Sequence, residues 1–195
     1  LCSGAGTTQM CIMLAVFMGK VLKKKTAVAG DEVTYSLMLR QMQKAAAIQH
    51  KGIASRHAYS MDGIDYYCGI RDEDIGILRQ KYDVIILDIS FENTFDNTNV
   101  TFARMVSRLS ACDEKILAGS MLPWKSRECE KKMERIERFL DIRGLKMVTL
   151  AACDKEAVSI IKKHGVEVVL IPFERNPFVI SGENLRSFLE LLKIT

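Results

Sequence analysis

The chain has 195 residues, of which 48% are hydrophobic and 27% are charged, and its formal net charge is +4. This composition is typical of one globular α/β domain that is long enough to bury a full core. The small net charge and the aromatic share of 7% do not favour a protein that stacks the bases of single-stranded nucleic acid. We therefore do not expect a nucleic-acid partner.

Apolar segments of strand length alternate with amphipathic segments of helix length, which predicts βαβ units. In chain order, the predicted elements are helix 8–24, strand 25–30, helix 33–49, strand 63–68, helix 73–81, strand 83–89, helix 99–111, strand 115–120, helix 124–142, strand 146–152, helix 154–164, strand 166–173 and helix 183–193. The predicted fold class is α/β, a three-layer sandwich with a mostly parallel sheet flanked by helices. We expect residues 1–195 to form a single domain and, because the chain begins with loop-like residues, to be a fragment of a longer chain whose first strand is truncated or absent.

The six cysteines lie at positions 2, 11, 68, 112, 129 and 153. None are spaced as C-x-x-C, and several lie in apolar segments. The pattern predicts reduced, buried thiols in a cytoplasmic protein, and neither a structural zinc site nor a disulfide scaffold. The nearly uncharged segment 10–18 is about half as long as the ~20 residues that a membrane-spanning helix needs. Any membrane contact is therefore expected to be peripheral.

The glycine-rich opening segment contains Gly4, Ala5, Gly6, Thr7 and Thr8. Backbone N–H groups at a helix N-terminus can hold an anion whatever the side chains are. If Gly6 is the second glycine of the phosphate-binding motif G-x-x-x-x-G-K-[ST], Thr8 takes the place of the magnesium-binding hydroxyl and Thr7 stands where the motif has its lysine. The alternative is a turn in which Thr7 or Thr8 caps the following helix.

The apolar stretch DVIILD ends in Asp88. A carboxylate in this position can order the hydration shell of a magnesium ion beside a nucleotide. The alternative is an aspartate that caps a loop. Because open α/β sheets bind ligands at the carboxyl ends of their strands, the glycine-rich segment and Asp88 together predict a nucleotide site with Thr8 and Asp88 associated with the magnesium ion.

Taken in order, the glycine-rich segment, KKTAVAGDE, YDVIILD, KILAGS and VVLIPFERNPF resemble the MinD/ParA class of P-loop NTPases over nearly the whole chain. The loop GAGTT is similar to a degenerate Walker A motif without its lysine. The resemblance implies that Asp31 positions the attacking water and that Pro172 and Phe173 lie beside the base. It offers Asp154 as a substitute for a base-binding asparagine. The alternatives are acidic residues that start a helix and a proline-stiffened connection.

By this resemblance, we expect a catalytically impaired, nucleotide-responsive or protein-interaction module that positions or assembles a larger machine. The implied ligands are ATP and Mg²⁺, with no cofactor as the alternative, and the implied partners are another protein or a second copy of the chain. Two other functions stay open. One is an active Mg²⁺-dependent ATPase in which a cation from another subunit or from Lys20 replaces the missing lysine. The other is a flavodoxin-like or receiver-like domain without a nucleotide site.

Overall fold

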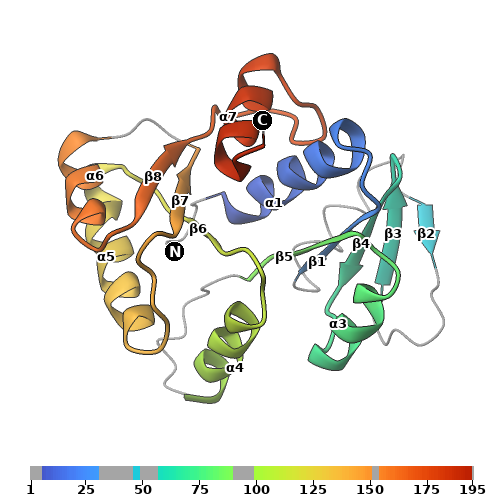
Figure 1. Ribbon diagram of the computed structural model, residues 1–195, viewed down its shortest axis with the longest axis horizontal. Helices are drawn as coiled ribbons and strands as arrows, with labels where there is room; N and C mark the ends of the chain where they lie inside the picture. The colour runs from blue at the N-terminus through green and yellow to red at the C-terminus, as the bar shows by residue number, and fades with distance from the viewer. Residues whose placement is uncertain (1–5, 31–45, 49–56, 90–98, 151–153, 195) are drawn as a thin grey trace. The chain divides into compact units, whose positions relative to one another are not determined.

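The computed structural model describes residues 6–30, 46–48, 57–89, 99–150 and 154–194 (Figure 1). The chain divides into two compact units. The first unit comprises residues 1–10, 90–175 and 181–195, and the second comprises residues 11–89 and 176–180. Each unit is described by itself.

The second unit contains a five-stranded sheet with the order β2-β3-β4-β1-β5. Its elements are most of helix α1 (Thr7–Val16), the π-helix η1 (Phe17–Val21), β1 (Thr26–Gly30), β2 (Ala46–Ile48), β3 (His57–Met61), β4 (Ile64–Cys68), α3 (Asp72–Arg79) and β5 (Val84–Leu87). β1 pairs in parallel with both β4 and β5, whereas β2, β3 and β4 pair antiparallel. The parallel part is the part that the sequence predicts.

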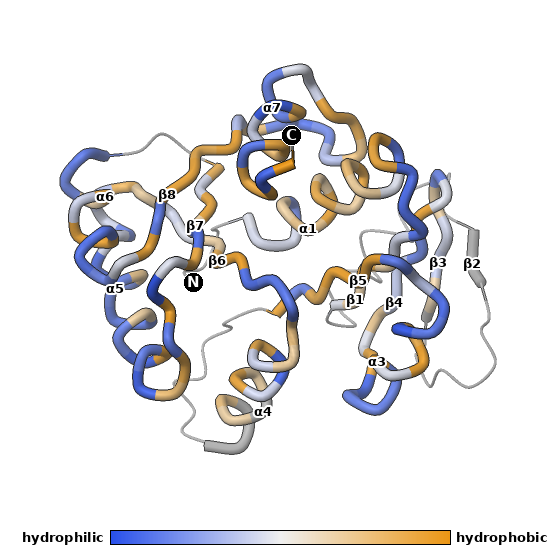
Figure 2. The backbone as a smooth tube through the Cα atoms, viewed as in Figure 1, coloured by the Kyte–Doolittle hydropathy of each residue, from blue (hydrophilic) through white to orange (hydrophobic). Residues whose placement is uncertain are grey.

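Helices cover both faces of this sheet. Side chains along a strand alternate between the two faces, so the apolar residues of β1 pack against a helix on each side. On one face, Val28 of β1 and Tyr66 of β4 belong to a core that includes Ile12 of α1. On the other face, Ala27 and Ala29 of β1 belong to a core that includes Leu78 of α3. The strand β5 is hydrophobic along most of its length (Figure 2). Apolar residues on both faces are what a parallel strand buried between two helical layers requires.

The antiparallel part of the sheet was not predicted. Strands β3 and β4 form a hairpin with Asp62 and Gly63 between them, whose φ angles are +54° and +80°. Two consecutive residues with positive φ are the mark of the type I′ turn, which suits the Asp-Gly pair. The prediction of helix 33–49 is wrong at 46–48, because this segment pairs with β3. Residues 33–45 of that predicted helix lie outside the described residues.

The first unit contains a parallel sheet with the order β6-β7-β8. Its elements are the first turn of α1, then α4 (Asn99–Ser110), β6 (Ile116–Ala118), α5 (Pro123–Glu137), β7 (Lys146–Thr149), α6 (Lys155–Lys162), β8 (Glu167–Leu170) and α7 (Gly182–Leu192). The core joins Met147 of β7 to Met133 of α5 and Ile161 of α6. The ammonium of Lys146 donates to the carbonyl oxygens of Glu190 and Leu191 at 3.4 and 2.5 Å, which ties the end of α7 to β7.

The predicted elements of the first unit are all present; most are shorter than predicted, and α7 has its predicted length but is shifted by one residue. The largest difference is at helix 124–142, because α5 ends at Glu137. The residues after it turn back toward β7, and Ile142 is buried in the core of the unit. The mixed α/β class with parallel strands flanked by helices is thus confirmed. The prediction of a single domain over residues 1–195 stays a prediction.

Three buried tyrosines lie on β4 and two residues before β5. The hydroxyl of Tyr82 donates to Asp65 Oδ2 at 2.6 Å and lies 2.7 Å from the hydroxyl of Tyr67. The hydroxyl of Tyr66 is buried and has no hydrogen-bond partner within the described residues. Burial raises the pKa of Tyr66, of Tyr67 and of Tyr82 above the ordinary tyrosine value.

These tyrosines predict a loss of stability in alkaline solution. Above pH ~10 the unfolded chain releases its tyrosine protons while the folded chain keeps them. Because the unfolded state then binds fewer protons, the free energy of unfolding falls as the pH rises. Urea denaturation at pH 8, 9.5 and 10.5 measures this slope. A flat profile would contradict the burial of these hydroxyls.

Two matched variants separate the bonded hydroxyl from the unbonded one. Tyr82→Phe is expected to lower the free energy of unfolding at pH 7 by about 1–3 kcal/mol, because it removes the donor to Asp65. Tyr66→Phe removes a buried hydroxyl without a partner and is expected to leave stability unchanged or to raise it. Equal losses in the two variants would show that the Tyr82 bond adds nothing.

Candidate functional site

The glycine-rich segment enters the described part of the chain at Gly6, whereas Gly4 and Ala5 lie outside it. Gly6 has φ +79°, and a Cβ atom added there would lie 2.5 Å from Cδ1 of Leu150. Its carbonyl oxygen accepts a hydrogen bond from Met10 N at 2.8 Å, which closes the first turn of α1. Both the backbone conformation and the contact with Leu150 therefore favour glycine at this position.

Thr7 and Thr8 are the first two residues of α1. The N–H groups in the first turn of a helix have no acceptor within the helix, and the helix dipole adds partial positive charge there. α1 carries no acidic residue in this turn. The arrangement suits an anion, and it places both hydroxyls at the end of the helix where the sequence predicts a phosphate.

A polar network that the sequence analysis missed supports this helix end. Gln9 Nε2 donates to the carbonyl oxygen of Glu174 at 2.5 Å, and Asn184 Nδ2 donates to Glu174 Oε2 at 3.0 Å. Asn184 is fully buried, and its Oδ1 has no hydrogen-bond partner among the described residues. The network joins the first turn of α1 to the segment after β8 and to the first turn of α7. Ser181 caps α7 by accepting from Asn184 N at 3.3 Å, and this capping pattern was the only local signal.

Pro172 and Phe173 lie in the same segment as Glu174, directly after β8. Pro172 is half-buried, and the side chain of Phe173 is 61% exposed. The preceding Ile171 N donates to Thr149 O at 3.0 Å, so the segment leaves the sheet beside the end of β7. The role of Pro172 and Phe173 beside a base stays a prediction. In this segment it is Glu174 that accepts hydrogen bonds, from Gln9 and Asn184.

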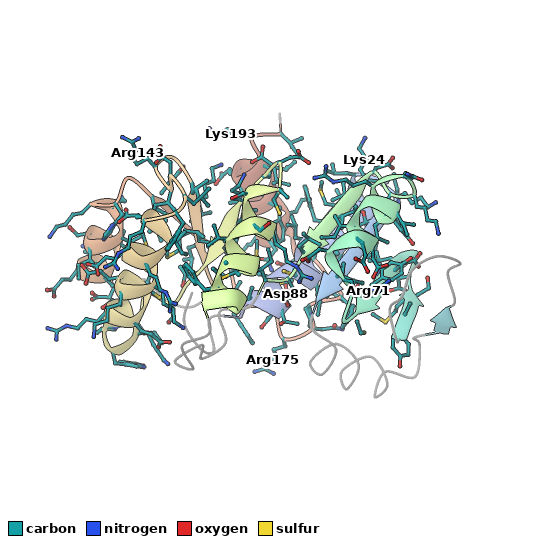
Figure 3. The ribbon with its side chains drawn as sticks, turned by 90° about the horizontal axis from the view of Figure 1, so that it is seen from below. Lys24, Arg71, Asp88, Arg143, Arg175 and Lys193 are labelled. Carbon is teal, nitrogen blue, oxygen red and sulfur yellow. The ribbon has the colours of Figure 1, made fainter. Side chains whose placement is uncertain are left out.

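Asp88 follows β5 in the second unit (Figure 3). Its backbone N–H donates to Ala29 O at 2.8 Å, which continues the pairing of β5 with β1. The residue is half-buried, and its Oδ1 is a buried atom. Asp88 thus stands at the carboxyl end of its strand, as predicted. Asp31, the predicted water-positioning residue, lies outside the described residues.

Two further candidates are engaged elsewhere. The side chain of Asp154 accepts from Ala157 N at 2.9 Å and caps α6, so its carboxylate serves as an N-cap. The ammonium of Lys20 pairs with Asp62 Oδ2 at 2.6 Å. Lys20 belongs to η1, which follows α1 at the end opposite Thr7. Lys20 is therefore a poor replacement for the missing lysine, contrary to the alternative considered from the sequence.

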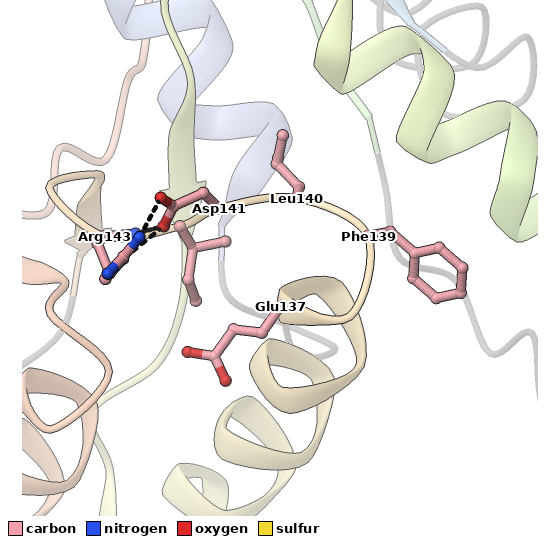
Figure 4. Close-up of a pocket in the computed structure, with 6 residues that line it drawn as sticks. Glu137, Phe139, Leu140, Asp141 and Arg143 are labelled. Carbon is pink, nitrogen blue, oxygen red and sulfur yellow. Dashed lines mark hydrogen bonds and ion pairs between the residues drawn. The ribbon is translucent and has the colours of Figure 1, made fainter.

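A shallow pocket of about 420 Å³ lies at the turn after α5 and is separate from these residues (Figure 4). Its lining consists of Glu137, Phe139, Leu140, Asp141, Ile142 and Arg143. The guanidinium of Arg143 bonds to the carboxylate of Asp141 at 2.7 and 2.9 Å and lowers the pKa of that carboxyl to about 2. All six residues come from one short segment, and none of them is a predicted site residue.

The described residues contain neither a metal-binding cluster nor a membrane-spanning helix. In that part of the chain, no group of three or more His, Cys, Asp or Glu side chains is placed to hold a metal ion. None of the described helices combines the length and the apolar character needed to cross a membrane. Cys11, Cys68, Cys112 and Cys129 form no disulfide among the described residues, and all but Cys112 are buried.

No protein-family model and no curated protein matches the chain. Among solved structures, it is similar to the MinD cell division protein of Aquifex aeolicus, with 14% identity and a TM-score of 0.59 over 88% of this chain and 78% of that one. It is also similar to a MinC:MinD cell division protein complex of the same organism, with 15% identity and a TM-score of 0.60 over 95% and 83%. At this identity the similarity shows the fold alone, which is similar to that of MinD.

The network at the end of α1 predicts a charge effect. Asn184→Asp would set a buried carboxylate against the carboxylate of Glu174. We expect the free energy of unfolding to fall by about 3 kcal/mol at pH 7, and by less near pH 4.5, where one of the two carboxyl groups takes up a proton. Denaturant unfolding at both pH values measures the difference. Asn176→Asp, at an exposed asparagine, is the control, and equal stability of the two variants would contradict the buried contact.

Proposed function

We propose that this protein is a nucleotide-responsive protein-interaction module of the MinD/ParA type, with a degenerate Walker A loop that binds phosphate but supports little or no hydrolysis. The observation that carries the proposal is Gly6, whose positive φ and close contact with Leu150 shape the backbone where α1 begins. A glycine turn that opens a helix is the part of a phosphate loop that does not depend on side-chain charge.

The residues present fit the phosphate part of a nucleotide. The backbone N–H groups at the start of α1 are the donors, and the hydroxyls of Thr7 and Thr8 stand among them. The partly buried network of Gln9, Glu174 and Asn184 holds the first turn of the helix in place. A bound Mg²⁺ would neutralise phosphate charge, and Thr8 and Asp88 stay the residues that the sequence predicts to be associated with it.

The absence of the motif lysine argues against efficient hydrolysis. In P-loop proteins this lysine reaches the phosphates, where its charge favours the transfer reaction. Thr7 stands at its place in this chain, and the ammonium of Lys20 is already bonded to Asp62. Binding through backbone groups can persist without the lysine, because the helix end supplies the donors.

A role in protein assembly is supported by analogy with the fold. One of the similar structures is a complex of MinD with MinC, so this fold is used for binding another protein. We extend that use to this chain and propose that it helps to position or assemble a larger machine. Its formation of a homodimer and its location in the cytoplasm stay predictions.

Calorimetric titration with ATP, with and without Mg²⁺, tests the nucleotide site. We expect micromolar binding that Gly6→Val abolishes, because the added side chain meets Leu150 and disfavours the positive φ. Gly76→Val, at an α3 position with no atom within 4 Å of an added Cβ, is the matched control. Thr8→Ala is expected to weaken binding only when Mg²⁺ is present. Absence of binding by the folded wild-type chain would reject the nucleotide site.

An ATP hydrolysis assay separates a binding module from an enzyme. We expect the wild-type chain to show no ATP turnover, because the lysine that assists transfer is missing. Asp88→Ala should then make no difference to the assay. Magnesium-dependent turnover in the wild-type chain that is lost in Asp88→Ala would instead establish an ATPase. Circular dichroism of the variant confirms that any loss reflects the site and not unfolding.

A further inference from the structure

Helix α5 presents a single stripe of exposed side chains. Its buried residues, Cys129, Met133 and Ile136, face the core of the first unit. The exposed residues recur at intervals of three or four positions, which places them on one side of the helix. Glu137, the last residue of α5, is also exposed, but it is bonded to His164 Nδ1 at 2.9 Å. The other exposed residues after Pro123 are Trp124, Arg127, Lys131, Glu134 and, directly after the helix, Arg138. We call this set the α5 stripe.

The cations of the α5 stripe differ from the other cations of the helix. Lys125 and Lys132 both pair with Glu128, at 3.2 and 3.1 Å. The guanidinium of Arg135 lies 4.2 Å from the centre of the Phe102 ring.

Arg127, Lys131 and Arg138 form no ion pair within the part of the chain that the structure describes. Glu134 is the one acidic member of the stripe, and the exposed carboxylate of Glu137 beside it is bonded to His164 Nδ1. The stripe therefore carries an excess of positive charge.

Trp124 stands at one end of the stripe and is 74% exposed. It follows Pro123, the first residue of α5. By contrast, the exposed Phe139 packs edge-on against Phe102, with ring centres 5.2 Å apart. Tryptophan and arginine are the residue types that most often carry the binding energy of protein interfaces. An exposed tryptophan beside unpaired cations is therefore an anchor with a defined charge preference.

We propose that the α5 stripe is a docking surface for an acidic segment of a partner protein. The inference rests on the proposed interaction role and says which surface serves it. Carboxylates of the partner would pair with Arg127, Lys131 and Arg138, and an apolar side chain would cover Trp124. Charge complementarity of this kind sets specificity and the association rate, and it weakens with added salt.

The composition of the stripe favours a protein over a lipid surface. The apolar side of α5 is already buried in the core, so Trp124 is the only apolar member of the exposed stripe. Membrane-surface helices instead bury a wide apolar face. Glu134 in the middle of the stripe would also repel an anionic headgroup or a phosphate backbone, whereas a protein partner can match it with a cation.

The single tryptophan of the chain makes the test direct, because the intrinsic emission reports on Trp124 alone. The probe is a synthetic peptide of repeated Glu-Glu-Leu-Ala units, and the control is a Lys-Lys-Leu-Ala peptide of equal length. We expect only the acidic peptide to shift the emission to the blue and to protect Trp124 from acrylamide. No protection by the acidic peptide overturns the proposal, as does protection by phosphatidylserine vesicles or duplex DNA in its place.

Variants locate the effect on the stripe. Lys131→Glu is expected to weaken binding of the labelled acidic peptide by about tenfold, whereas Lys162→Glu, at an exposed lysine of α6, leaves it unchanged. Equal effects of the two variants would overturn the proposal. Peptide binding without ATP binding would reject the nucleotide site and keep the docking surface. ATP binding without peptide binding would do the reverse.

Discussion

Strand β1 is the element on which the second unit depends. It pairs with β4 on one side and β5 on the other, and its residues Ala27 and Val28 are fully buried in cores on opposite faces of the sheet. Small alanines on one face let α3 pack closely, while Val28 meets α1. The carbonyl oxygens near the end of β1 also hold Asp88 and Gly69 by backbone hydrogen bonds. The position of the predicted magnesium-associated carboxylate thus follows from how β1 pairs.

The first unit is organised around a different constraint, which is the close approach of Gly6 to Leu150. A Cβ atom at position 6 would lie 2.5 Å from Cδ1 of Leu150, the residue directly after β7, so the turn that starts α1 lies against the end of that strand. The polar contacts of Glu174 add a second tie between α1 and α7. These contacts position the first turn of α1, as the proposed phosphate-binding backbone requires.

The charges of α5 divide between contacts within the first unit and the proposed docking surface. Its pairs with Glu128 and the contact of Arg135 with Phe102 use part of the positive charge within the unit. The remaining cations lie on the side that faces away from the core. Arg127, Lys131 and Arg138 form no ion pair among the described residues, so no ion pair within the unit depends on their charges. Exposed ion pairs contribute little to stability. Substitutions on this surface are therefore expected to have little effect on the stability of the unit.

The sequence by itself determined the class of the fold, the order of its parallel strands along the chain and the start of α1 at the glycine-rich segment. Runs of β-branched residues and helical periodicity are local signals, and they act within a few turns of chain. A glycine beside two threonines likewise marks a helix start without reference to the rest of the molecule.

Only the tertiary structure decided the pairing of β2 with β3, the end of α5 and the network of Gln9, Glu174 and Asn184. Ala46–Ile48 has no strand pattern of its own and becomes a strand because β3 supplies its hydrogen bonds. Nothing in the sequence distinguishes Asn184 from other residues near the start of a helix, and only folding brings it to Glu174. Contacts between residues far apart in the chain leave no periodic trace, and for that reason they appear only once the chain has folded.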